Sequence, residues 1–174
     1  MMRALFVVLS LFAASALSTA GAAESCDQRC KVQQLIDQNV GIPFDRPLTL
    51  EIMRKFAPLL KETKEPVPEY VGVMKCQFEY TGLVVTVIVR PDNSMLVWTI
   101  ALTGGNYRMA HGIKLGKITG PDINTILGPP METRRDDGKP LQWVYTNLEQ
   151  TEVVNIDRTE TEILAVHWDF TPGD

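Results

Sequence analysis

The sequence contains few of the groups that enzymes use for chemistry. Its 174 residues include two histidines and three cysteines, and beyond residue 22 the serines are Ser25 and Ser94. Neither serine lies in a Gly-x-Ser-x-Gly elbow, and the chain has no Gly-x-x-x-x-Gly-Lys phosphate loop. We therefore predict that the protein is not an enzyme and that it holds no metal and no cofactor.

The remaining candidates for catalysis are isolated from one another in the sequence. His111 lies in a Gly-containing linker, and His167 lies in an otherwise apolar strand pattern, where a lone histidine is typically a hydrogen-bonded structural residue. Cys76 would form a thiol–imidazole pair only if folding brought a histidine beside it, and no spacing supports that. The acidic residues within 149–162 follow no calcium-loop spacing, and we interpret them as solvated hairpin edges.

The chain also lacks an excess of basic residues. It has 21 acidic residues against 17 Lys and Arg, which gives a formal net charge of −4. Nucleic-acid binding needs a basic surface that displaces counterions from phosphates. We therefore expect no nucleic-acid partner.

A single long apolar run is present, at the N-terminus. Met1-Met2-Arg3 precedes an uncharged segment over 4–17, and Ala20-Gly21-Ala22 supplies the small residues of a cleavage site. Residues 1–22 are therefore predicted to be a signal peptide, and the mature protein periplasmic or secreted. No later run has the length of a membrane span, so we expect no integral membrane segment after cleavage. A lipid-bearing Cys would directly follow the cleavage site, whereas Cys26 comes later.

Three cysteines in an exported chain predict one disulfide and one free thiol. Cys26 and Cys30 are four residues apart, so on a helix they would lie on one face within reach of a bridge. Cys76 alternates with Phe78 and Tyr80 in a strand pattern, as a buried small hydrophobe does. We favour a Cys26–Cys30 disulfide, with pairing of either to Cys76 as the alternative. The spacing is not that of a redox or zinc site.

Periodicity predicts an α+β fold made of two tandem helix-plus-antiparallel-sheet units after an N-terminal helix. The predicted divisions are the helix at 23–42, a first unit at 43–104 and a second unit at 112–172. The first unit is predicted to have a helix, a polar loop and three strands, in this order: 48–60, 62–69, 74–80, 83–89 and 95–102. The second is predicted to have the same order: 119–127, 134–140, 141–146, 152–156 and 162–170.

A short internal similarity supports this division. Residues 77–83 and 142–148 match at four of seven positions at an offset of 65, with Phe78 replaced by Trp143. The same order of elements surrounds both segments. We interpret the pair as an internal duplication.

Two strands of the first unit are apolar on both faces. Residues 84–89 are apolar at both parities, while regular alternation places Leu96, Trp98, Ile100 and Leu102 on one face of the next strand. Such strands are usually buried on both sides, and one helix covers only one side. Either the two units or the N-terminal helix cover the second face, or an apolar patch stays open for a partner protein.

The segment 116–130 resembles a known family signature. Thr119, Ile123, Leu127, Gly128 and Pro130 are similar to the "Thr, aliphatic four later, Leu-Gly-x-Pro" pattern of the SmpA/OmlA lipoproteins of outer-membrane assembly. A duplicated unit of this kind also occurs in secreted proteins similar to β-lactamase inhibitory protein. The resemblance implies a helix-then-sheet unit in which Thr119 caps the helix and Gly128 closes it. The chain lacks the family's lipid-bearing Cys.

Together these features predict an exported protein-binding protein, an inhibitor or immunity-type protein that docks on an envelope or secreted partner enzyme. An envelope assembly scaffold and a small-ligand-binding protein are the alternatives. The expected partner-binding residues belong to types that are favoured at interface hot spots: Trp98, Tyr107, Arg108, Met109 and His111. An ordinary linker, with Tyr107 and Met109 packed between the units, is the competing interpretation of this loop.

Overall fold

The computed structural model describes residues 26–42, 47–135, 137–147 and 150–170. The predicted signal peptide lies outside these residues, as do the first residues of the predicted N-terminal helix. Among the described residues, no helix combines the length and the apolar character that a membrane crossing requires.

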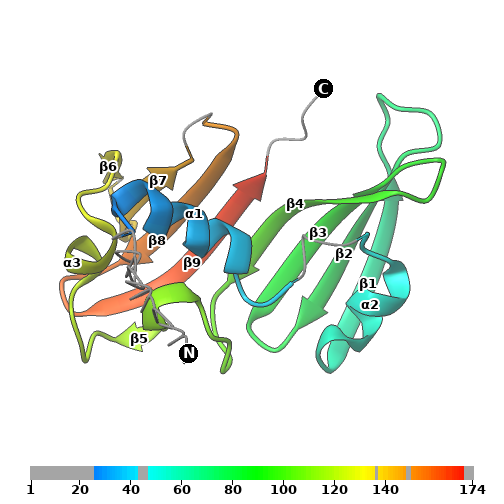
Figure 1. Ribbon diagram of the computed structural model, residues 1–174. Helices are drawn as coiled ribbons and strands as arrows, with labels where there is room; N and C mark the ends of the chain where they lie inside the picture. The colour runs from blue at the N-terminus through cyan, green and yellow to red at the C-terminus, as the bar shows by residue number, and fades with distance from the viewer. Residues whose placement is uncertain (1–25, 43–46, 136, 148–149, 171–174) are drawn as a thin grey trace, which may run out of the picture.

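The predicted α+β class is confirmed, with an antiparallel sheet and short helices (Figure 1). The helical elements are α1 (Gln28–Gln38), α2 (Leu50–Phe56), η1 (Ala110–Gly112) and α3 (Ile123–Leu127). The strands are β1 (Leu59–Pro66), β2 (Met74–Tyr80), β3 (Leu83–Val89), β4 (Met95–Leu102), β5 (Gly116–Lys117), β6 (Glu132–Arg134), β7 (Leu141–Thr146), β8 (Glu152–Arg158) and β9 (Glu162–Phe170).

All nine strands of the described chain form one continuous sheet. Its order is β1-β2-β3-β4-β9-β8-β7-β6, and β5 adds to β9. The two halves of the chain meet at the centre, where β4 pairs antiparallel with β9 from Thr99↔Asp169 to Leu102↔Val166. The halves therefore lie side by side in one sheet, and their faces do not pack against each other.

The helices lie against one face of the sheet, which we call the covered face. The indole nitrogen of Trp168 donates to the Leu35 carbonyl of α1 at 3.1 Å, and the Tyr80 hydroxyl donates to the Met53 carbonyl of α2. In α3, the Gly128 carbonyl accepts from the Tyr145 hydroxyl at 3.2 Å. Strand register links all three sheet positions to the same face. The core therefore forms between this face and the helices.

The first helix of the sheet region is shorter than predicted, and a strand replaces the predicted loop. α2 ends at Phe56 because Pro58 has no N–H to donate and restricts the residue before it. The segment predicted as a loop at 62–69 is largely β1, which pairs with β2 from Leu59↔Tyr80 to Pro66↔Met74. Its Lys and Glu side chains are compatible with a strand because β1 lies at the edge of the sheet.

The predicted Thr119 cap is also wrong. α3 begins at Ile123, and the side chain of Asp122 accepts the N–H of Ile123 at 2.7 Å. Gly120 and Pro121 lie between Thr119 and the first helical turn. The predicted C-terminal Gly is correct: Gly128 caps α3 at φ +78°, a conformation that glycine adopts without strain.

Candidate functional site

The second face of the sheet is the candidate site, and we call it the open face. In the described part of the chain, each α-helix contacts the covered face. The alternative in which the N-terminal helix covers the second face of the sheet is therefore wrong. Val144 and Ala165 lie on the open face and are buried, yet they stand outside the hydrophobic core cluster. Neighbouring side chains of the sheet itself shield them.

A β-bulge places Trp98 on the open face. Thr86 pairs with Thr99 and Val87 with Val97, so Trp98 is the extra residue of β4. The Lys75 ammonium lies 5.7 Å from the centroid of the Trp98 ring. The expectation that Trp98 shares a face with Ile100 is therefore wrong, because the bulge changes the parity of the strand.

Apolar side chains surround Trp98 on β3 and β4. Register places Val84, Ile88, Leu96 and Ala101 on this face, and all four are half-buried. Trp98 itself is 38% exposed, a large value for an indole. The strands that are apolar on both faces had suggested, as one alternative, an apolar patch exposed to solvent, and these residues form such a patch. We call these five residues the apolar half of the open face.

A polar cluster lies beside the apolar half, on β7, β8 and β9. The Asp157 carboxylate accepts from Gln142 Nε2 at 2.8 Å and lies 3.4 Å from His167 Nε2. Asn155 Nδ2 donates to Asp169 at 2.9 Å. These five residues form the polar half of the open face, and strand register joins the two halves because His167 pairs with Ala101.

The polar half has more acceptors than donors. Its two carboxylates and two side-chain amide oxygens face few N–H groups, and Asn155 Oδ1 is buried with no hydrogen-bond partner among the described residues. An orphaned buried acceptor costs about 1 to 3 kcal/mol. Such a surface is complementary to a group that donates hydrogen bonds or carries positive charge.

Sequence reasoning missed the polar half because it treated Asp157 as a solvated hairpin edge. Asp157 instead lies in β8, an interior strand between β7 and β9. The available signal was the alternation of Asn155 and Asp157, two residues apart, with His167 and Asp169 at the same spacing in the next strand.

The other predicted binding residues lie away from the open face. Met109 is 5% exposed and belongs to the core, while Tyr107 stacks on Phe56 with ring centroids 6.4 Å apart. Burial raises the pKa of the Tyr107 hydroxyl. Arg108 is exposed. Tyr107 therefore packs on α2 and Met109 in the core, whereas packing of the two residues between units stays a prediction.

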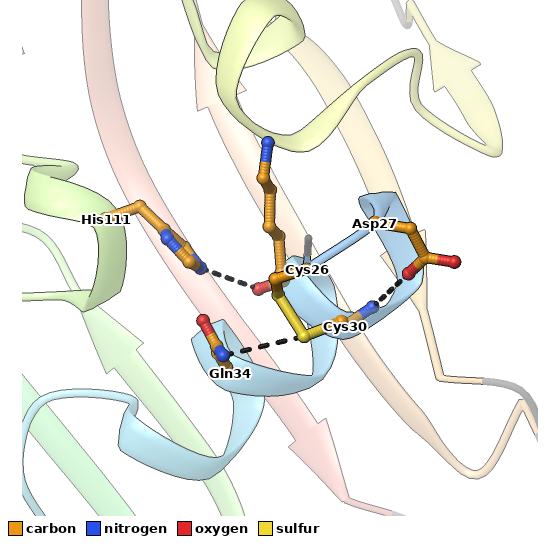
Figure 2. Close-up of a disulfide and its surroundings, with 6 residues drawn as sticks. Cys26, Asp27, Cys30, Gln34 and His111 are labelled. Carbon is orange, nitrogen blue, oxygen red and sulfur yellow. Dashed lines mark hydrogen bonds between the residues drawn. A yellow bond between two sulfur atoms is a disulfide. The ribbon is translucent and has the colours of Figure 1, made fainter. Parts of the chain in front are cut away.

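His111 lies against α1 (Figure 2). Its Nε2 is 3.0 Å from the carbonyl oxygen of Lys31, and its backbone adopts φ +57°. The structure thus does not bring His111 together with Trp98. It attaches the linker to the first helix.

The predicted disulfide between Cys26 and Cys30 is confirmed, at the N-terminus of α1 (Figure 2). Asp27 caps the helix by accepting from Cys30 N at 2.9 Å, and Gln34 Nε2 is 3.5 Å from Cys30 Sγ. Cys76 is free and buried on the covered face, and desolvation raises the pKa of its thiol. His167 lies on the opposite face, so these two residues form no thiol–imidazole pair.

Within the described residues, no group of three His, Cys, Asp or Glu side chains is arranged to hold a metal ion. No protein-family model matches the sequence. No curated protein matches it either.

Among solved structures, a cysteine-rich secretory protein from Staphylococcus aureus subsp. aureus Mu50 is a weak match, at 12% identity and a TM-score of 0.32. The match covers 80% of this chain and 43% of that one, so this chain spans less than half the length of that neighbour. At this TM-score the likeness assigns neither a family nor a function.

Proposed function

We propose that the protein is an exported protein-binding protein that docks on a partner through the open face, as an inhibitor or immunity-type protein does. The observation that carries this proposal is the composition of that face. This sheet surface, which no helix of the described residues covers, presents an exposed indole among aliphatic side chains, directly beside an acceptor-rich polar cluster. Interface cores combine aromatic and aliphatic anchors with a few polar groups that fix orientation.

The chemistry of the face defines the partner. Asp157 and Asp169 lie in the polar half, where Gln142 and Asn155 each supply one donor to them. A partner Lys or Arg would complete this hydrogen bonding, and its desolvated pairing would give the complex its orientation. The predicted signal peptide places the encounter outside the cytoplasm, so the partner is an envelope or secreted protein.

The proposed tandem units are supported by a pair of tyrosines. Tyr80 and Tyr145 are 65 residues apart, at the offset of the internal similarity. Each donates its hydroxyl hydrogen to a main-chain oxygen at the helix of its own half, Met53 for Tyr80 and Gly128 for Tyr145. This repeated bond is what a duplicated helix-plus-sheet unit would retain. The resemblance to the SmpA/OmlA and β-lactamase-inhibitory-protein groups implies such a unit.

The proposal is tested by site-specific photo-crosslinking in the cells that make the protein. A photoreactive residue replaces Thr99 on the open face, and the matched control replaces Lys55, an exposed residue of α2. We expect one discrete adduct with a second protein from position 99 and none from position 55. The adduct should disappear in Asp169→Lys and weaken in Trp98→Ala, because these changes reverse a charge and remove the indole.

Binding of the purified partner to the purified mature chain then gives the dissociation constant and its dependence on salt. A loss of affinity with rising salt is expected, since the polar half pairs with positive charge. Equal labelling from positions 99 and 55, or an adduct that Asp169→Lys leaves unchanged, would contradict the proposal.

A further inference from the structure

The edge of the sheet formed by β1 has an unused row of backbone groups. Among the described residues, β1 pairs with β2 on one side and with no strand on the other. Val67 N donates to Val73 O at 3.0 Å, which directs the backbone of Val67 toward β2. Antiparallel strands alternate, so the N–H and C=O groups of Glu62 and Lys64 point away from the sheet. The backbone of Pro66 also points away from β2, so the absence of an N–H at Pro66 removes no hydrogen bond between β1 and β2.

The charges of the side chains along this edge are complementary to those of the same segment placed antiparallel. From Lys61 to Glu65 the sequence is Lys-Glu-Thr-Lys-Glu. Placed antiparallel to a second copy, Lys61 meets Glu65, Glu62 meets Lys64, and Thr63 meets Thr63. Every cross-strand pair is then an opposite-charge pair or a Thr–Thr pair, and both kinds stabilise neighbouring strands.

We propose that the protein forms a two-fold symmetric dimer in which the β1 edges of two copies pair antiparallel about Thr63. The dimer uses the β1 edge and neither the apolar half nor the polar half of the open face, so it is independent of the proposed function. The result is one sheet that continues through both copies. The interface is isologous, because each strand contributes the same residues to it.

Ion pairs between β1 and β2 within one copy already alternate in charge, as the pairs across the proposed dimer would. On the open face, Lys61 lies 3.6 Å from Glu79, and Lys75 lies 2.8 Å from Glu65. In the dimer, the partner's Glu65 adds beside Lys61. The row across four strands then becomes Glu79, Lys61, the partner's Glu65 and the partner's Lys75, with the charge alternating at each step.

The pairing is specific in register. A shift by one residue puts Lys61 opposite the partner's Lys64 in one direction, and Glu62 opposite the partner's Glu65 in the other. A shift by two residues puts either Glu62 or Lys64 opposite its own copy. Like charges directly opposite each other destabilise a sheet, so each neighbouring register is disfavoured. Charged edge strands usually prevent the addition of another strand. The charge order of this edge instead matches a second copy of β1 in the antiparallel direction.

The length of the contact is limited. Outward backbone groups of Glu62 and Lys64 in both copies supply about four intermolecular hydrogen bonds. Pro66 has no N–H with which to extend the ladder, and the register of β1 with β2 shifts between Leu59 and Lys61. The dimer is therefore reversible and depends on protein concentration and salt.

A cysteine at the two-fold axis tests the geometry. Thr63 is exposed, and in the dimer it faces its own copy as a non-hydrogen-bonded pair, with Cα atoms about 4.5 Å apart. That separation lies within the range of a disulfide. Lys61→Cys is the matched control: its two copies would stand four residues apart along the strands, roughly 13 Å. The native free thiol, Cys76, is buried and does not interfere.

We expect Thr63→Cys to form a covalent dimer under mild oxidation about tenfold faster than Lys61→Cys, because only the former meets the geometric requirement. Equal rates for the two variants would overturn the proposal. Circular dichroism of both reduced variants verifies that each retains the sheet.

Charge variants supply a second readout by sedimentation velocity. Lys61→Glu places a Glu opposite the partner's Glu65, and Glu65→Lys places a Lys opposite the partner's Lys61, while both leave the Arg54–Glu62 pair intact. Each variant should remain monomeric alone, whereas a 1:1 mixture, which restores opposite charges at every charged pair, should dimerise about as strongly as the wild-type chain. A monomeric mixture together with a wild-type chain that stays monomeric at every concentration would also refute the dimer.

Discussion

The indole nitrogen of Trp168 donates a hydrogen bond to the carbonyl oxygen of Leu35 across 3.1 Å, and both residues are completely buried. This bond joins α1 to the strand at the centre of the sheet. The same carbonyl accepts Asn39 N at 3.1 Å at the end of the helix. One main-chain oxygen therefore serves both the helix terminus and the attachment of the helix to β9.

Trp168→Phe should lower the free energy of unfolding by about 1 to 3 kcal/mol, because it removes a buried hydrogen bond and part of a ring. Urea titration measures the change. Trp98→Phe is the control on the open face, where the indole is part exposed, and it should change stability by no more than about 0.5 kcal/mol. Equal losses for the two variants would contradict this account of α1.

Gly82 is expected to be intolerant of any side chain. It has φ +71°, and a Cβ at this position would lie 2.3 Å from the carbonyl carbon of Gly104. Gly112 has the same φ of +71° with open space around it, so it is a matched control. Gly112→Ala should cost about 1 to 2 kcal/mol for the backbone conformation alone. Gly82→Ala should lower the free energy of unfolding by clearly more, because the backbone of Gly104 must also move. Thermal unfolding of the two variants measures the difference.

Deleting Trp98 should leave the fold intact. Val97 and Thr99 already face Val87 and Thr86, so removal of the bulged residue produces a regular ladder with every other side chain on its original face. We expect a cost of about 1 to 2 kcal/mol from the lost apolar contact. Deletion of Thr86 would reverse the faces of half of β3, and that variant should not fold. Heteronuclear NMR spectra of the two deletion variants distinguish these outcomes.

Glu62 should make the free energy of unfolding depend on pH in the acidic range. Its hydrogen bonds with Arg54, at 2.7 and 2.9 Å, are the main reason why its pKa falls from 4.5 to about 2 in the folded protein. The unfolded chain therefore takes up the proton first, and the stabilisation is complete above about pH 4.5 and is lost as the pH falls toward 2. Urea titrations at several pH values should show a flatter decline for Glu62→Gln. Arg54→Gln should flatten it equally; an unchanged slope in both variants would exclude the pair as the cause.

Local patterns were sufficient for the strands that carry strong β-branched or alternating runs. β2, β3 and β4 have the residue ranges that the sequence predicts, and the favoured Cys26–Cys30 disulfide is confirmed, although Cys26 precedes the N-cap of α1 and is not itself helical. β1 was missed because an edge strand has no buried face to impose alternation, and its Lys and Glu residues resemble a solvated loop. The charge pattern of β1 becomes informative only once its place at the edge is known.

The arrangement of the open face depended on pairing between strands, of which local patterns gave only part. A bulge arises from the match between two strands, so nothing in the sequence around Trp98 indicates that the parity changes there. The polar half requires the β8–β9 register, which brings Asn155 opposite His167. Whether a lone strand histidine has a carboxylate neighbour is therefore decided by pairing between strands.

The central position of β9 also constrains how the protein is made. β9 is the last strand in the described part of the chain, yet it borders β4, β5 and β8. Until the ribosome has released residues 162–170, each of these three strands presents an unfinished border. Completion of the sheet therefore depends on this segment, and β4 meets its central partner only after all the residues between the two strands have been synthesised.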